Sequence, residues 1–261
     1  MDDLNLNAYL DRIHWTGPLN QDLETLAALQ LGHVSVIPFE NLDVQLGHPI
    51  RLDLASLQNK LVDRRRGGYC FEKNSLLAAV LRKLGFRVTL REGRVRRGVT
   101  RLLPRTHLAL QVDMAEGAFL VDGGFGADGP LGPVPLMGSV ATYFRETSRV
   151  LQEGSLQVLQ VLRGADWLDL YALEPGTPQS IDLEMANYYT STHPDSRFVQ
   201  VLTAQCARPE ARWNLRNFEL TVRDTNGEQT GIISPSNLLS LLRTRFGLEV
   251  PEGTRFRFQE V

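Results

Sequence analysis

Hydrophobic residues recur every three or four positions through the first 85 residues, which is the spacing of amphipathic helices. Polar residues and Gly17-Pro18 divide this region into short elements. The pattern predicts three helices: one carrying Leu6, Leu10, Ile13 and Trp15; one capped by Asn20, carrying Leu23, Leu26 and Ala27 and ending near Gly32; and one capped by Asp53, carrying Leu54, Leu57 and Leu61.

After Gly85 the hydrophobic period changes to two, the period of β-strands. Candidate strands cover residues 86–90, 107–112, 119–122, 156–160 and 167–173. Short strands joined by hairpins favour a barrel or a sandwich. The last segment predicts strands near 201–206 and 218–222, an Asn226-Gly227 hairpin, a helix between 234 and 247 and a final strand at 255–259. The fold class is therefore α+β.

Composition and charge narrow the functional classes. The 261 residues are 43% hydrophobic and 22% charged with a net charge of −2, so no global charge favours nucleic acid. No apolar run approaches the ~20 residues that span a bilayer, and residues 1–5 do not resemble a signal peptide. Two distant cysteines, Cys70 and Cys206, argue against a disulfide framework, and no Cys/His spacing predicts a metal site. We therefore expect a cytoplasmic protein without a metal.

The stretch RRRGGYCFEKN, residues 64–74, organises the rest of the chain. Two glycines run directly into a helix that carries Leu77, Leu81 and Leu84, so Cys70 falls in its first turn. Free amides and the positive end of the helix dipole favour a thiolate there. A buried cysteine that only packs is the alternative, and it holds unless a base lies nearby.

A second segment, PFEN at residues 38–41, places Glu40 between large apolar residues. Glu40 is either a surface acid in a loop or a buried partner of an arginine such as Arg66, which would hold the glycine turn in place. The pattern does not choose between the two.

Among the five histidines, His107 is the candidate base because it opens a strand. His14, His33, His48 and His193 fall in predicted helices, turns or loops where a structural role suffices. A hairpin turn around residues 113–116 predicts a register that places Asp122 directly opposite His107, with Cβ atoms about 5 Å apart. Cys70 would then attack, His107 would take its proton and Asp122 would orient the imidazole. A cross-strand polar pair without catalytic duty is the alternative.

Features for an anion and an aromatic group surround this triad. Four glycines between residues 123 and 129 can offer backbone amides to phosphate. An arginine-rich segment just before His107 suggests a phosphorylated cofactor and contains Arg94, Arg96, Arg97, Arg101 and Arg105. Phe39, Val95 and Phe125 can supply apolar walls for an aromatic acceptor.

Five motifs together resemble the arylamine N-acetyltransferases. They are PFEN at 38–41, RGGYCFEKN at 66–74, THL at 106–108, VDGGFG at 121–126 and STHPDSRF at 191–198. The resemblance implies a helical bundle at 1–85 that carries the nucleophile, a β-barrel at 86–190 that carries His107 and Asp122, and an α/β lid at 191–261. It implies a triad like that of thiol proteases, with Cys70, His107 and Asp122 in the family's catalytic positions.

The same resemblance implies the reaction and the contacts. It implies acetyl-CoA-dependent, ping-pong N-acetylation of arylamines or arylhydrazines through an acetylated Cys70, as in xenobiotic metabolism. Thr106, Phe125 and Gly126 would lie near the coenzyme, and Phe39 and Val95 near the acceptor. The expected partners are coenzyme A, a small aromatic amine or hydrazine, and a second copy in a homodimer, without nucleic acid or membrane.

One position departs from the resemblance. Glycine stands at 123 where the family commonly has a larger aliphatic residue, which predicts a looser loop after Asp122 and an effect on acceptor size and rate. Other readings of the chain are a thiol hydrolase or transglutaminase-like enzyme, an amide synthase with a bulkier acyl donor, and a binding module whose thiol is incidental.

Overall fold

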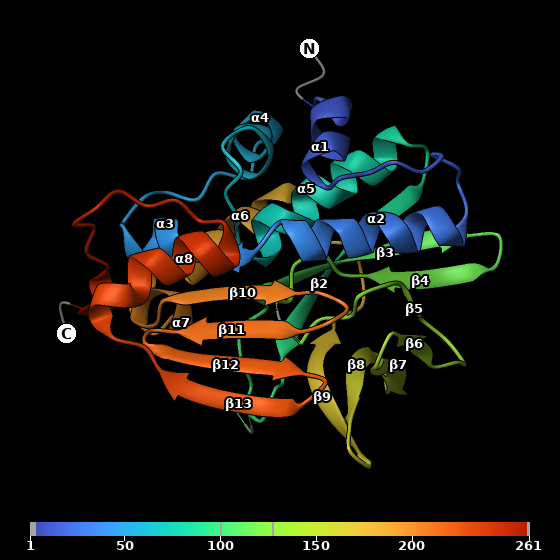
Figure 1. The fold of residues 1–261 in the computed structure, drawn as a ribbon. Helices are drawn as coiled ribbons and strands as arrows, with labels where there is room; N and C mark the ends of the chain where they lie inside the picture. The colour runs from blue at the N-terminus through green and yellow to red at the C-terminus, as the bar shows by residue number, and fades with distance from the viewer. Residues whose placement is uncertain (1–3, 100, 127, 260–261) are drawn as a thin grey trace.

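Helices form the N-terminal part of the protein, and side-chain caps set where several of them begin (Figure 1). The computed structural model describes residues 4–99, 101–126 and 128–259. Asn5, Asp22 and Asp53 each accept a hydrogen bond from a backbone amide three residues later. The helices are α1 Leu6–Arg12, α2 Leu23–Val36, α3 Leu42–Gln45, α4 Leu54–Leu57, a π-helical turn Gln58–Asp63, and α5 Cys70–Lys83.

The second helix differs from the prediction at both ends. Asp22 rather than Asn20 is its cap, and the helix continues through Gly32 to Val36. Gly32 lies inside the helix where Ile13, the residue after α1, packs close to it: a Cβ atom there would lie 3.3 Å from Ile13 Cδ1. The first helix ends at Arg12, so Trp15 lies beyond it.

A nearly closed eight-stranded barrel follows, in the order β5-β4-β3-β2-β9-β8-β7-β6. Helix α5 packs on β2 and β3, which brings the first turn of the helix to the wall of the barrel. The strands are β2 Arg87–Val95, β3 His107–Met114, β4 Gly117–Val121, β5 Val134–Pro135, β6 Ala141–Tyr143, β7 Glu146–Glu153, β8 Leu156–Arg163 and β9 Asp166–Leu173. The hydrophobic pattern did not predict β5, β6 and β7, because two are very short and β7 carries mostly polar residues.

The register of the β3–β4 hairpin differs from the prediction by two positions. Met114 pairs with Gly117 around a two-residue turn, and the last pair is Leu110 with Val121. Asp122 therefore follows the end of the ladder instead of pairing with His107. The turn length is still even, so the two side chains lie on the same face and meet across the strand end.

A second sheet has the order β1-β10-β11-β12-β13. Its first strand, β1 Phe39–Glu40, comes from the N-terminal part, and Phe39 pairs with Gln205 of β10. The other strands are β10 Thr203–Ala207, β11 Arg212–Arg216, β12 Glu219–Asp224 and β13 Gly227–Ile232. The remaining helices are α6 Ser180–Thr192, α7 Arg197–Gln200, α8 Leu238–Phe246 and two short 3-10 turns, Pro235–Asn237 and Arg257–Gln259.

The predicted final strand at 255–259 is wrong. This segment forms a 3-10 turn because Phe256 is fully buried in the core of the C-terminal part, and the Phe258 amide donates to Gln45 Oε1, 3.1 Å away. The Asn226-Gly227 hairpin is confirmed between β12 and β13.

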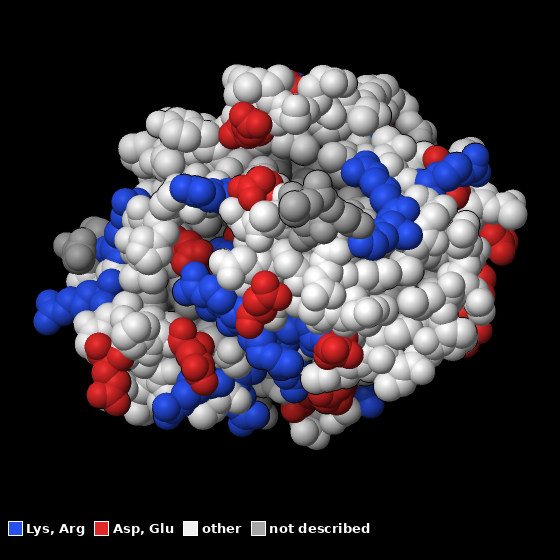
Figure 2. Space-filling model, turned by 90° about the horizontal axis from the view of Figure 1, so that it is seen from above, with Lys and Arg blue, Asp and Glu red and all other residues white. Residues whose placement is uncertain are grey.

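The surface carries both signs of charge. Figure 2 shows the molecule from above the view of Figure 1, and on this face lysine and arginine side chains lie next to aspartate and glutamate side chains. Within the described residues, no helix combines the length and the apolar character that a bilayer crossing requires.

Candidate active site

Cys70 is the first residue of α5, as the sequence predicts. The turn before it is tightly packed: a Cβ atom on Gly67 would lie 2.2 Å from the Pro38 carbonyl oxygen, so only glycine fits. The Tyr69 amide donates to Glu72 Oε2 at 3.1 Å, which closes the helix start. These contacts fix the Cys70 side chain, which is 3% exposed, at the positive end of the helix.

The thiol faces the beginning of β3. Cys70 Sγ lies 3.4 Å from the Thr106 carbonyl oxygen, and the Cys70 side chain is close enough to the imidazole of His107 to help raise its pKa. His107 Nε2 donates to Asp122 Oδ2 at 2.7 Å. The three side chains thus lie together where the helix meets the barrel.

Burial and ion pairing set the charges in this series. His107 and Asp122 are 2% and 1% exposed. Burial opposes a charged His107, but the Asp122 carboxylate and the Cys70 side chain outweigh it and raise the pKa of His107 to about 10. Burial likewise opposes a charged Asp122, but the imidazole and hydrogen bonds from Asn74 and Gly124 lower its pKa. The geometry therefore holds an imidazolium against a carboxylate, beside a buried thiol.

Other side chains that hold Asp122 were not predicted. Asn74, one turn after Cys70, donates to Asp122 Oδ1 at 2.9 Å. The Tyr171 hydroxyl on β9 donates to Oδ2 at 2.8 Å, and Gln30 Nε2 on α2 donates to the Asp122 carbonyl oxygen at 3.2 Å. Asn74 shares the helix stripe with Cys70, which is a usable signal. Tyr171 and Gln30 reach the site only through the tertiary fold.

Lys73 is a further residue that sequence reasoning missed. It is buried on α5, and its ammonium group contacts the Ile37 carbonyl oxygen just before Pro38. Burial lowers the pKa of Lys73 to about 7.

The predicted contact residues divide into two groups. Phe39, Phe125 and Gly126 line one cavity together with Asp122 and Gly123. Phe125 also packs its ring 5.1 Å from those of His107 and Tyr171. Thr106 and Val95 lie outside this cavity: Thr106 flanks the thiol through its carbonyl oxygen, and Val95 pairs with Tyr171 at the end of β2.

Gly123 does not loosen the loop after Asp122, so that prediction is wrong. Its amide donates to Asn74 Oδ1 at 2.8 Å. A Cβ atom there would lie 2.8 Å from His33 Cδ2 and 2.9 Å from Leu77 Cδ2. The space that a larger side chain would need is therefore occupied by His33 and Leu77.

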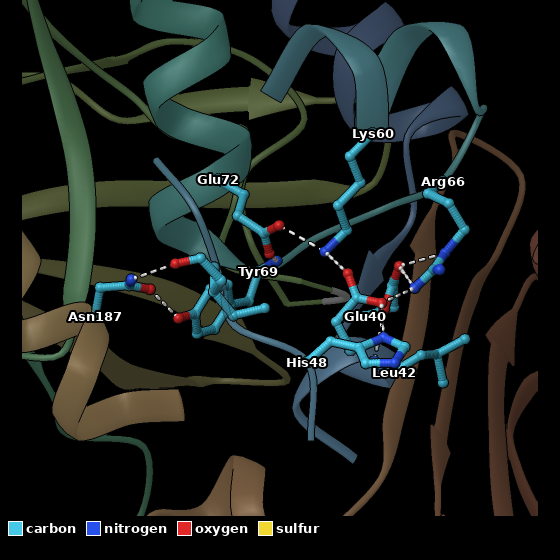
Figure 3. A network of polar contacts seen from close by, with 10 residues as sticks. Glu40, Leu42, His48, Lys60, Arg66, Tyr69, Glu72 and Asn187 are labelled. Carbon is cyan, nitrogen blue, oxygen red and sulfur yellow. Dashed lines mark hydrogen bonds and ion pairs between the residues drawn. The ribbon is translucent and has the colours of Figure 1, made fainter. Parts of the chain in front are cut away.

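Glu40 is a buried partner of Arg66 and not a surface acid. Arg66 Nη2 lies 2.8 Å from Glu40 Oε1 and 3.1 Å from Asp43 Oδ1, and the Leu42 amide donates to Glu40 Oε2 (Figure 3). Glu40 is 1% exposed. The buried pair therefore ties the glycine turn to β1.

Lys60 extends this network to α5, the helix that begins at Cys70. Its ammonium group lies 2.6 Å from Glu72 and 2.6 Å from Asp43. Figure 3 shows Lys60 pointing between Glu72 and the Glu40–Arg66 pair. Burial raises the pKa of Glu72 to about 7, although Lys60 opposes the shift.

The arginine-rich segment before His107 is largely engaged with the protein itself. Arg94 pairs with Glu174 at 2.7 Å, Arg96 with Glu153 at 2.8 Å, and Arg97 with Asp128. Arg105 lies 3.9 Å from Glu92. These four side chains brace the barrel, so their charges do not by themselves indicate a phosphate site. Position 100 in this segment and position 127 in the glycine loop lie outside the described residues.

Comparison with known proteins identifies the class to which this fold and site belong. A family model described as N-acetyltransferase matches residues 22–255, almost the whole chain.

Within the described residues, no three His, Cys, Asp or Glu side chains are grouped so that they could hold a metal ion.

Individual relatives narrow the class. The arylamine N-acetyltransferase of Mycobacterium tuberculosis is 40% identical over 260 residues, covering 95% of this chain and 91% of that protein. The solved structure of the M. tuberculosis enzyme superimposes with a TM-score of 0.90 at 39% identity, covering 93% of each chain. The Mycobacterium marinum enzyme in complex with CoA superimposes with a TM-score of 0.88 at 36% identity, covering 93% of this chain and 92% of that one. The chain belongs to the arylamine N-acetyltransferase family and is an acyltransferase.

Proposed function

We propose that the protein transfers an acetyl group from acetyl-CoA to an aromatic amine or hydrazine by a ping-pong mechanism through a thioester on Cys70. One observation carries the proposal: the buried Cys70 thiol at the start of α5 lies beside the buried His107 imidazole, which is hydrogen-bonded to the Asp122 carboxylate. The M. marinum relative solved in complex with CoA supports acetyl-CoA as the donor.

In the first half-reaction, His107 holds the proton of the Cys70 thiol while Sγ attacks the acetyl carbonyl carbon. The bond between that carbon and the coenzyme sulfur breaks, and the departing sulfur takes the proton from His107. Asp122 binds Nε2 of the ring, which leaves Nδ1 to exchange the proton. The raised pKa of His107 supports a proton that stays on the imidazole near neutral pH.

In the second half-reaction, the amine nitrogen attacks the thioester carbon and the bond to Sγ breaks. The nitrogen loses one proton to His107, and Cys70 returns as a thiolate. The 3% exposure of Cys70 limits how much bulk water reaches the thioester.

We also propose which residues near Cys70 contact the coenzyme and which contact the acceptor. Thr106, Phe125 and Gly126 are proposed to contact the coenzyme, and Phe39 and Val95 the acceptor. Residues 1–85, 86–190 and 191–261 are proposed to act as nucleophile-bearing bundle, barrel and lid. We also propose a cytoplasmic location, which cell fractionation can test, and a homodimer, which solution scattering can test.

The first experiment is the intact mass of the protein after mixing with acetyl-CoA and no acceptor. We expect a gain of one acetyl group in the wild type, its loss on adding an arylamine, and no gain in Cys70→Ser. Cys206→Ser is the matched control and should still gain the group. An acetylated Cys70→Ser variant would contradict the thioester, and acetyl loss that needs no amine would indicate a hydrolase.

A further inference from the structure

The cavity beside the triad is small. It lies between Phe39, Phe125, Gly126 and Asp122 and has a volume of about 10 Å³, which is room for one water molecule. A protein cavity that binds benzene measures about 150 Å³. An aromatic acceptor that enters here therefore has to displace part of the cavity wall.

Most of the wall is fixed by packing. The ring of Phe39 lies 5.8 Å from that of Phe198, and Phe125 packs on both His107 and Tyr171. Lys73 is buried inside α5 and bound to the Ile37 carbonyl oxygen. Moving any of these side chains would disturb the core or the triad itself.

Gln205 is the long polar side chain in the wall. It lies opposite Phe39 in the β1–β10 ladder, so both side chains project from the same face of the sheet toward the cavity. Its amide oxygen lies against Gly126, where a Cβ atom would approach it to 2.3 Å. Its amide nitrogen donates to Thr203 Oγ1 at 2.9 Å. The residue is half-buried, and its long side chain can turn without moving the backbone.

We propose that Gln205 is a specificity-determining residue that sets the size limit for the amine acceptor, by filling the space between Phe39 and Gly126. This inference rests on the proposed acetyl transfer to aromatic amines. Single-ring acceptors need little more than a small turn of the Gln205 amide. Fused-ring acceptors need the side chain to leave Gly126 and give up its contact with Thr203.

The test is a competition between aniline and 2-aminofluorene for one acetyl-enzyme. Both acceptors react with the same Cys70 thioester, so the product ratio reports the ratio of their kcat/KM values. It does not depend on enzyme concentration or on the first half-reaction. In Gln205→Ala we expect the ratio of 2-aminofluorene product to aniline product to rise about tenfold, mainly through a lower KM for 2-aminofluorene.

Two further variants separate size from polarity. Gln205→Leu keeps most of the volume and removes the amide, and it should retain the wild-type ratio. Thr203→Val removes one hydrogen bond of the Gln205 amide and should shift the ratio in the same direction as Gln205→Ala, but less. This variant also tests the proposal if Gln205→Ala does not fold. Gln229→Ala, an exposed position on β13 of the same sheet, is the matched control and should leave the ratio unchanged.

Each outcome is decisive. An unchanged ratio in Gln205→Ala, or an equal rise in Gln205→Leu, overturns the size limit. A rise in Gln205→Ala and Thr203→Val without a rise in Gln205→Leu establishes it. A wild-type enzyme that acetylates neither amine overturns the proposed function and, with it, the role of Gln205.

Discussion

At the scale of single residues, His107 is the point where burial and charge oppose each other most strongly. Its ring is almost fully buried, yet the carboxylate 2.7 Å away favours the protonated form. The folded protein therefore holds the proton far more tightly than an unfolded chain, in which the pKa of histidine is about 6.5. This difference in proton binding links the site to stability.

Replacing His107 should change how stability depends on pH. Because folding raises the pKa of His107 to about 10, its contribution is full below pH 6.5 and is lost as the pH rises through 10. We expect His107→Gln to lower the free energy of unfolding by about 3 kcal/mol at pH 7 and by clearly less at pH 10. Urea titrations at both pH values measure this. His193→Gln, an exposed histidine, is the control, and a loss that grows with pH would contradict the prediction.

At the scale of elements, the start of α5 combines two requirements. The first turn must be well ordered to place Cys70, and its free amides must remain available to negative charge. Glu72 serves the first requirement, because Oε2 accepts from the Tyr69 amide while Oε1 binds Lys60. One side chain thus joins the cap of the helix to the ionic network below it.

Truncating Glu72 should weaken this helix start. Glu72→Ala removes both contacts, so we expect the free energy of unfolding to fall by about 2–3 kcal/mol and acetylation of Cys70 to slow. Glu72→Gln keeps an acceptor for the Tyr69 amide and should lose less. Urea unfolding and the rate of acetyl mass gain are the measurements, with exposed Glu184→Ala on α6 as control. Equal losses in the two Glu72 variants would show that the charge, rather than the cap, is what matters.

At the scale of the whole molecule, β1 connects the nucleophile turn to the C-terminal sheet. Phe39 and Glu40 pair with β10, the Glu40 amide donates to the Gly68 carbonyl oxygen, and Arg66 binds the Glu40 carboxylate. The two residues of β1 therefore connect three parts of the chain: β10, the glycine turn at Gly68, and Arg66 just before that turn. The wall of the small cavity depends on the same junction, since Phe39 and Gln205 are neighbours in it.

Removing Arg66 should destabilise the whole protein. Arg66→Met leaves the Glu40 carboxylate buried without its main partner, and we expect a loss of about 3–5 kcal/mol. The double variant Glu40→Gln/Arg66→Met should recover much of this loss, because position 40 then no longer carries a buried charge without its partner. Urea denaturation measures both, and exposed Arg64→Ala is the control. A double variant as unstable as Arg66→Met would show that hydrogen bonding, not the unpaired charge, sets the cost.

The local pattern predicted those parts of the site that neighbouring residues define. Cys70 at a helix start follows from the glycine pair and the leucine spacing, and the meeting of His107 with Asp122 follows from a hairpin turn of even length. The register itself was wrong by two positions, because the pattern does not say which two residues form the turn. The Asn20 cap failed for a similar reason: Asn20 and Asp22 are both good caps, and the local pattern does not decide between them.

By itself, the sequence determined the α+β class and the family resemblance, and it singled out Cys70, His107 and Asp122 as the candidate catalytic residues, because short-range periodicity and contiguous motifs encode all of these. The tertiary structure alone decided that Glu40 is buried on Arg66, that Tyr171 and Gln30 hold Asp122, that the arginines before His107 brace the barrel, and that Gln205 closes the cavity. These contacts join residues 13 to 166 positions apart, and no local spacing specifies which of them will meet.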